Sequence, residues 1–182
     1  MMRGGLFTRY FLEEGIRETE AYRAKELGDI VAFAEVVRSR WANLADMRHP
    51  SEAETESEFI HPILNHLGWE HLPQQEPGKG RKDIADALLF LTADDKAKAR
   101  RLHQTADRFR LGVIVVENEA RDTPLDRASG KGEAPSSQLL RYLIRAQTQS
   151  NGSMQWGMLT SGHYWRLYWA NAPARAEGFN RI

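Results

Sequence analysis

The chain has 182 residues, the size of one domain, and no cysteine, which excludes disulfides, thiolate metal sites and cysteine-based catalysis. Its 25 Lys and Arg residues balance 25 Asp and Glu residues, so any contact with nucleic acid must come from a local basic patch. No apolar run approaches the roughly 20 residues that span a bilayer, and the N-terminus lacks the apolar core of a signal peptide. We therefore expect a cytoplasmic protein without a membrane partner.

The first third of the chain is predicted to be helical. Apolar residues recur every three or four positions over 20–47, which predicts one long amphipathic helix. After a break that ends at Pro50, Ser51 and Glu54 have the spacing of a capping box at the start of a second helix. That helix is expected to end at Gly68, a residue typical of helix C-termini.

The rest of the chain alternates strands and helices, which predicts an α/β fold with a mixed central sheet flanked by helices. Residues 111–116 are β-branched and apolar on both faces, as in a central strand. This core is expected to span 51–182, with 1–50 as an N-terminal helical extension packed on it. The predicted elements are a strand at 84–91, a helix at 92–109, a strand at 111–116 continuing to Glu119, a helix at 136–149 that Ser136 caps, and a hairpin of strands at 154–159 and 164–169.

Three acidic residues stand out because they lie within or at the end of apolar strands. Asp86 lies in the run 84–90, and Glu117 and Glu119 close the next strand on one face, about 6.6 Å apart along it. Buried like charges are costly, and a bound divalent cation relieves that cost. Mg²⁺ prefers oxygen ligands, with Mn²⁺ as a substitute, so Asp86, Glu117 and the backbone carbonyl of Asn118 are predicted to hold one metal ion.

Each of these residues also has a purely structural interpretation. A Glu-x-Glu at a strand end is usually a solvated edge, and Asp86 could pair with Arg81 or Lys82. A site is favoured by the combination of an acid in one strand, Glu-x-Glu in the next, and a helix on each side.

These motifs resemble the PD-(D/E)xK nuclease superfamily, whose pattern is a Glu-bearing helix, a strand with Asp, a strand with Glu-x-Lys, and a helix. Here Asp86 follows Ala85, where the family name has Pro, and the second motif is Glu117-Asn118-Glu119. Gln138 and Tyr142 resemble the Gln-x-x-x-Tyr box of the branch that includes RecB-type exonucleases. The resemblance implies a restriction-endonuclease-like core and metal-dependent hydrolysis of DNA.

Further segments look like the N-terminal nuclease of type IIG restriction–modification enzymes. The resemblance implies that the chain is a fragment whose DNA-recognition region and adenine methyltransferase are fused or associated partners. Cutting both strands would require two such sites, so transient pairing of two copies on DNA is compatible with this function, and the oligomeric state is left open. The matching segments are 6–19, 59–64 with 67–69, 122–126, and 156–162 with 165–168.

One departure from the family concerns the lysine of Glu-x-Lys, which Glu119 replaces, in a register that Pro124-Leu125-Asp126 fixes. Some members of the superfamily carry a second Glu there and still cleave. Glu119 could therefore orient or deprotonate water, or bind a second cation, while Lys79 or Lys82 could supply the missing charge. The alternative function is a catalytically degenerate module that binds DNA or a partner without cleaving.

The glutamate that the family places on a helix is ambiguous here. Glu52 and Glu56 are four residues apart and share a helix face, and Glu56 is favoured because it continues toward the apolar face of the helix. Each could equally be an acid that complements the helix dipole.

The helix at 136–149 is expected to face the site and DNA with its polar side. Gln138 could orient a catalytic group or a water. Contacts with DNA phosphates are predicted for the helix residues Arg141, Tyr142 and Arg145, and for the loop residues Lys79, Arg81 and Lys82. The alternative is a solvated helix face.

Overall fold

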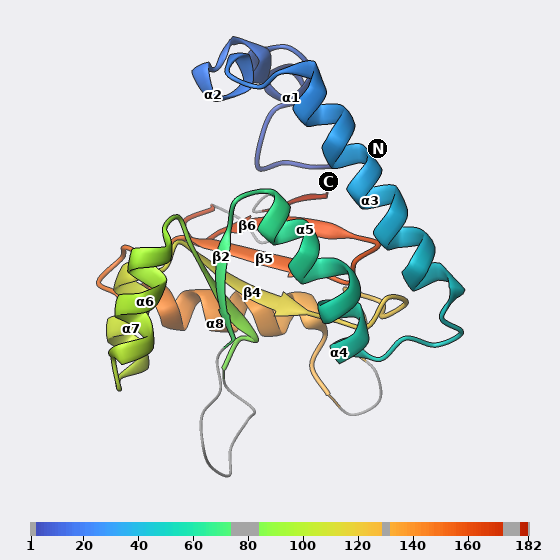
Figure 1. Ribbon diagram of the computed structural model, residues 1–182. Coiled ribbons are helices and arrows are strands. Elements are labelled where there is room, and N and C mark those ends of the chain that lie inside the picture. Colours follow the sequence, from blue (N-terminus) through green and yellow to red (C-terminus); the bar gives the residue numbers. More distant parts are fainter. Residues whose placement is uncertain (1–2, 74–83, 129–131, 173–178, 182) are drawn as a thin grey trace.

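The computed structural model describes residues 3–73, 84–128, 132–172 and 179–181 of the chain. Their strands form one seven-stranded sheet in the order β1-β7-β6-β5-β4-β3-β2, with helices on both faces (Figure 1). The predicted α/β fold with a mixed sheet flanked by helices is confirmed at this level.

All neighbouring strands of the sheet are antiparallel except β4 and β5, which run parallel. A parallel pair needs a crossover, and α8 (Pro135–Gln149) supplies it. The strands are β1 (Arg3–Gly4), β2 (Glu70–Pro73), β3 (Ala87–Phe90), β4 (Ile114–Asn118), β5 (Trp156–Thr160), β6 (Trp165–Trp169) and β7 (Phe179–Arg181).

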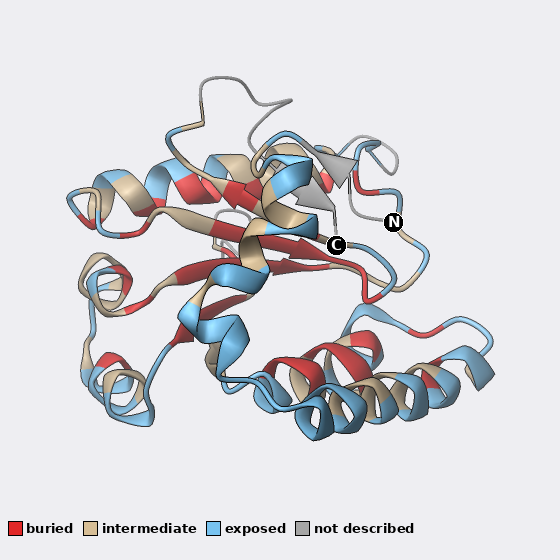
Figure 2. Cartoon of the chain, turned by 90° about the horizontal axis from the view of Figure 1, so that it is seen from above, coloured by how far each residue is buried: buried red, intermediate tan, exposed pale blue. Residues whose placement is uncertain are grey.

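Two hydrophobic cores lie on opposite faces of the sheet, and Figure 2 shows the buried residues concentrated in the central strands and on the helix sides turned toward them. Alternation along β4 divides its side chains between the faces: Val115 packs with α8, and Val116 packs with the helices that follow residue 26. The strand is therefore buried on both sides, as its sequence predicts.

The predicted long helix over 20–47 is wrong, because the chain forms α2 (Glu20–Arg23) and α3 (Leu27–Asp46) with a break between them. Glu26 and Asp29 cap the start of α3 reciprocally. The core contacts of α3 begin at Phe33 and continue toward its C-terminal end, where they include Trp41 and Leu44.

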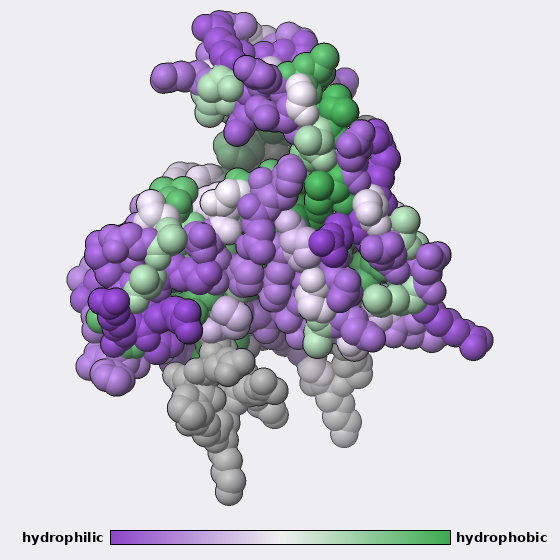
Figure 3. Space-filling view, in the orientation of Figure 1, coloured by the Kyte–Doolittle hydropathy of each residue, from purple (hydrophilic) through white to green (hydrophobic). Residues whose placement is uncertain are grey.

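Near its N-terminus α3 leaves part of its apolar stripe in solvent, and Leu27 is 76% exposed. Figure 3 shows hydrophobic surface over this helix. The short elements α1 (Arg9–Glu13), η1 (Gly15–Glu18) and α2 lie at this end of α3, away from the sheet, and bury no residue (Figure 1). The apolar residues of α2 and of the first turns of α3 therefore recur with helical spacing without being buried in the core.

The second predicted helix forms as α4 (Glu52–Thr55), η2 (Glu56–Ile60) and α5 (His61–His66), with the expected capping box at Ser51 and Glu54. The central part, η2, is a π-helical turn, in which the N–H of His61 donates to the carbonyl of Glu56 five residues earlier. Pro62 follows directly and cannot donate a backbone hydrogen bond. π-turns widen a helix locally and often occur at functional sites.

The predicted helix over 92–109 is also divided, into α6 (Ala93–Arg101) and α7 (Thr105–Leu111). The side chain of Arg108 donates two hydrogen bonds, of 2.9 and 2.7 Å, to the backbone carbonyl of Leu102, which has extended geometry. A side chain thus stabilises the turn in a stretch that lacks Gly and Pro, so no local sequence signal marks it.

Strand positions agree with the predictions apart from their ends. Asp86 lies just before β3 rather than inside it, Leu111 ends α7 rather than beginning a strand, and Glu119 follows β4. The helix α8 begins at Pro135, so Ser136 is not its cap. Strands β1, β2 and β7 were not predicted. None of the helices in the described ranges combines the length and apolar composition that crossing a membrane requires.

Candidate metal centre

One edge of the sheet brings the predicted acidic residues together, where β3 begins and β4 ends. Ala87 pairs with Val116 in the antiparallel ladder, so the next position outward places Asp86 opposite Glu117. The sequence predicted these two neighbouring strands and their acids, and the ladder register explains why the carboxylates meet.

Asn118 connects Asp86 with the helix that carries Glu56. Its backbone N–H donates a 2.7 Å hydrogen bond to Oδ2 of Asp86, and its side-chain Nδ2 donates a 2.8 Å bond to Oε1 of Glu56. The asparagine is 2% exposed, whereas Asp86 and Glu56 are half-buried, so both bonds lie at the border between the core and the site. Asn118 therefore fixes two carboxylates that come from different elements.

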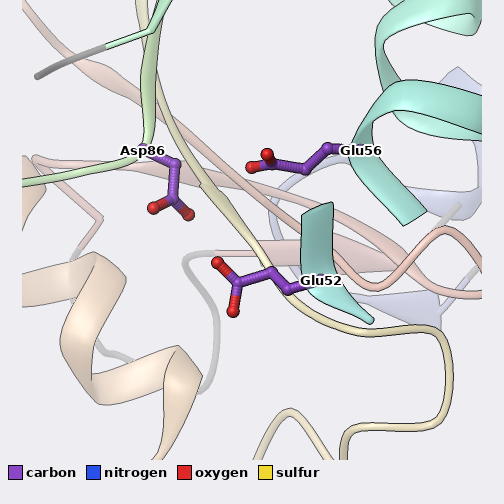
Figure 4. Close-up of side chains that lie close together, drawn as sticks. All are labelled: Glu52, Glu56 and Asp86. Carbon is purple, nitrogen blue, oxygen red and sulfur yellow. The ribbon is translucent and has the colours of Figure 1, made fainter. Parts of the chain in front are cut away.

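Three carboxylates converge at this edge: Glu52, Glu56 and Asp86 each place an oxygen within 4.8 Å of the other two. Figure 4 shows them turned toward one another, the glutamates from the helix and Asp86 from the start of β3. The predicted ligand set shares only Asp86 with this group, which contains Glu52 and Glu56 in place of Glu117 and Asn118. The two glutamates, weighed as alternatives from the sequence, lie side by side.

Glu117 is 4% exposed and lies on the other face of β4 from Asn118. Its Oε1 accepts a hydrogen bond from Nε2 of Gln138 on α8, while its Oε2 is buried and finds no hydrogen-bond partner among the described residues. Burial raises the pKa of Glu117 to about 9, and the nearby carboxylates of Asp86 and Glu119 add to the increase.

The pKa values of Asp86 and Glu119 are also raised. Burial raises the pKa of Asp86 to about 7, with Glu52, Glu56 and Glu119 contributing through repulsion, although the N–H of Asn118 opposes the shift. Burial and the charge of Glu52 raise the pKa of Glu119 to about 7. In the described part of the chain, no lysine or arginine forms an ion pair with Asp86, Glu117 or Glu119.

These residues fit a hard divalent cation. All the available donors are oxygens, the type that Mg²⁺ and Mn²⁺ bind. The three converging carboxylates repel one another when ionised, and burial together with this repulsion raises the pKa of Asp86 to about 7. A cation bound between Glu52, Glu56 and Asp86 would offset this repulsion.

The structure agrees with only some of the predictions for residues around the site. Gln138 reaches Glu117 directly, and Arg141 and Arg145 are exposed on α8. The predicted exposure of Tyr142 is wrong, because its ring is 4% exposed and packs in the core on the α8 side of the sheet. The rotation of α8 turns Tyr142 toward the sheet and leaves Ile144 50% exposed. Lys79, Arg81 and Lys82 lie outside the described residues.

An ion pair that the sequence analysis missed orders the loop after β4. Arg166 of β6, 4% exposed, donates to both carboxylate oxygens of Asp126. Leu125 is buried in the core beside it, and its carbonyl accepts from the N–H of Ser136 at the start of α8. Asp126 and Arg166 belong to the segments 122–126 and 165–168, which were noted for their family resemblance. Nothing in the sequence of either segment indicates that the two contact each other.

Comparison of the chain with protein-family models, with curated proteins and with solved structures found no match.

Proposed function

We propose that this chain is a metal-dependent DNA endonuclease domain with a restriction-endonuclease-like core, belonging to a restriction–modification enzyme with methyltransferase and target-recognition partners. The observation that carries the proposal is the set of acids at one sheet edge: three converging carboxylates beside a buried Glu117 whose Oε2 has no partner among the described residues. The motif resemblance and the α/β architecture are consistent with it.

Glu52, Glu56 and Asp86 would hold Mg²⁺, with Glu117 beside them. When bound, the cation would polarise the scissile phosphate and lower the pKa of a water molecule. Asn118 holds Asp86 and Glu56 in place, and Gln138 orients Glu117. The chain's own residues thus fix the positions of the acids before substrate binds.

Glu119 is the proposed proton acceptor. Its pKa of about 7 leaves it able to take a proton from the attacking water at neutral pH. The water oxygen forms a bond to phosphorus, one P–O ester bond breaks, and the leaving oxygen takes up a proton from solvent. In this role Glu119 would act on the attacking water at the position of the superfamily's lysine, without supplying the positive charge of a lysine.

The proposal predicts that the protein nicks supercoiled plasmid DNA in Mg²⁺ and not in EDTA. Asp86→Asn and Glu117→Gln should abolish nicking, whereas Glu58→Gln should retain it, because Glu58 lies in the same helix but outside the carboxylate group. Thermal melts should show that each variant folds. Equal nicking by wild type, Asp86→Asn and Glu117→Gln would refute the assignment.

A further inference from the structure

A hollow of about 360 Å³ lies beside the candidate metal centre, between α7, α8 and the residues that precede β3. Ala85, the neighbour of Asp86, lines it, and so does Tyr142, which lies one helical turn beyond Gln138. Its volume is within the roughly 300–1,000 Å³ typical of small-ligand pockets. The hollow and the acidic site therefore share adjacent residues of two elements.

The lining of this hollow has an apolar floor and a polar rim. Buried Phe109, Val115 and Tyr142 form the floor with Ala85, so two of its four members are aromatic. The rim carries two side-chain amides, from Gln104 and Gln149. Apolar and aromatic surfaces suit the faces of a flat ring, and amides suit the hydrogen-bonding edge of a nucleobase.

The charged groups on the rim are basic. His103 and Arg145, both exposed, line the opening, and the described residues that line the hollow include no Asp or Glu. An anionic ligand would thus meet favourable charge at the mouth of the hollow, in contrast to the acidic centre a few residues away.

We propose that this hollow binds one unstacked nucleotide of the DNA strand next to the cleaved phosphate, with the base on the apolar floor and a phosphate toward Arg145. The inference rests on the proposed endonuclease function and specifies its substrate, since withdrawing a base is least costly where the strand is already unpaired. DNA with an unpaired nucleotide beside the cut is then the preferred substrate.

The test measures the binding of deoxynucleoside 5′-monophosphates to the full chain in EDTA, through changes in backbone amide chemical shifts in NMR spectra. We expect saturable shifts at Ala106 and Gln149, both of which line the hollow, and weaker or no shifts with inorganic phosphate alone. Arg145→Gln should weaken binding about tenfold, as for loss of a charge-assisted hydrogen bond. Arg38→Gln, on exposed α3 across the sheet, is the matched control and should bind like wild type.

A second variant tests the space rather than the charge. Ala106→Phe places a ring at the hollow and should prevent nucleotide binding while the thermal melt shows a folded protein. Shifts equal to those with inorganic phosphate, or binding unaffected by both Arg145→Gln and Ala106→Phe, would overturn the proposal. Because these measurements contain no Mg²⁺, plasmid nicking without nucleotide binding refutes only this inference, and nucleotide binding without nicking refutes only the endonuclease.

Discussion

Arg166 donates to Asp126 through its two terminal guanidinium nitrogens, Nη1 at 2.5 Å and Nη2 at 2.8 Å, so that a buried cation of β6 is neutralised by the loop between β4 and α8. The guanidinium is 5% exposed and the carboxylate 53% exposed, which means that the loop closes over the charge from the solvent side. The bond connects the loop beyond the candidate site to the strand beside β5.

We predict that Asp126→Asn lowers the free energy of unfolding by about 1–3 kcal/mol, because a buried guanidinium would lose its charged partner. Urea denaturation at neutral pH measures the change. The control is Asp122→Asn in the same loop, whose side chain is 71% exposed and should cost less than about 0.5 kcal/mol. Equal effects of the two substitutions would show that the Arg166 ion pair does not stabilise the loop.

A second prediction concerns the affinity of the site for Mn²⁺. Glu56→Gln removes one charge from the group that contains Glu52 and Asp86, so we expect at least about tenfold weaker binding. Isothermal titration calorimetry measures the affinity. Glu58→Gln, with the same loss of charge in the same π-helical turn, should match wild type. If both variants lose affinity equally, the effect reflects net charge rather than coordination.

The stability of the metal-free protein should fall as the pH rises from about 4.5 to 9. The folded-state pKa values of Asp86 and Glu119, about 7, and of Glu117, about 9, exceed the values near 4 of an unfolded chain. Over this interval the folded protein binds more protons than the unfolded chain, so increasing pH favours unfolding. The contributions of Asp86 and Glu119 end near pH 7, and that of Glu117 continues to about pH 9.

Urea denaturation in EDTA between pH 5 and 9 tests whether the free energy of unfolding decreases as the pH rises. Glu117→Gln should flatten the decrease above pH 7, since a neutral amide can still accept the hydrogen bond of Gln138. Saturating Mg²⁺ should also reduce the decrease, because a bound cation stabilises the ionised acids. A stability that rises with pH in EDTA would contradict the assigned shifts.

Substitutions of Glu119 test its place in the reaction. We expect Glu119→Gln to slow nicking about 100-fold, because the amide cannot accept a proton. Glu119→Lys should retain more activity than Glu119→Gln if the position is equivalent to the lysine of the resembling family. The rate of plasmid nicking in Mg²⁺ measures both variants. Wild-type nicking by Glu119→Gln would exclude the residue as proton acceptor.

The central strands of the sheet could be predicted because strands that are buried on both faces consist of contiguous apolar residues. The hairpin of β5 and β6 was predicted because its turn contains Gly162, which has a φ of 72°. By contrast, the break between α6 and α7 depends on Arg108 reaching the carbonyl of Leu102 six residues earlier, and neither Gly nor Pro marks that turn in the sequence.

The candidate site was predicted in its residue types but not in its full membership. Asp86 and Glu117 could be identified because charged residues are unusual beside apolar strands. The joint approach of Glu52 and Glu56 to Asp86 could not, because it depends on how the helix packs on the sheet and includes a π-turn. Tyr142 was misplaced because the apolar residues of α8 extend around more of the helix than its buried face.

The alternation of Glu117 and Asn118 along β4 ties assembly of the site to completion of the sheet. Glu117 meets α8 on one side, while Asn118 meets Glu56 on the other. A slip of β4 by a single residue would exchange the two side chains between the faces and break their bonds to Gln138 and Glu56. The correct register of β4 is therefore a condition for holding Asp86, Glu56 and Glu117 in their observed positions.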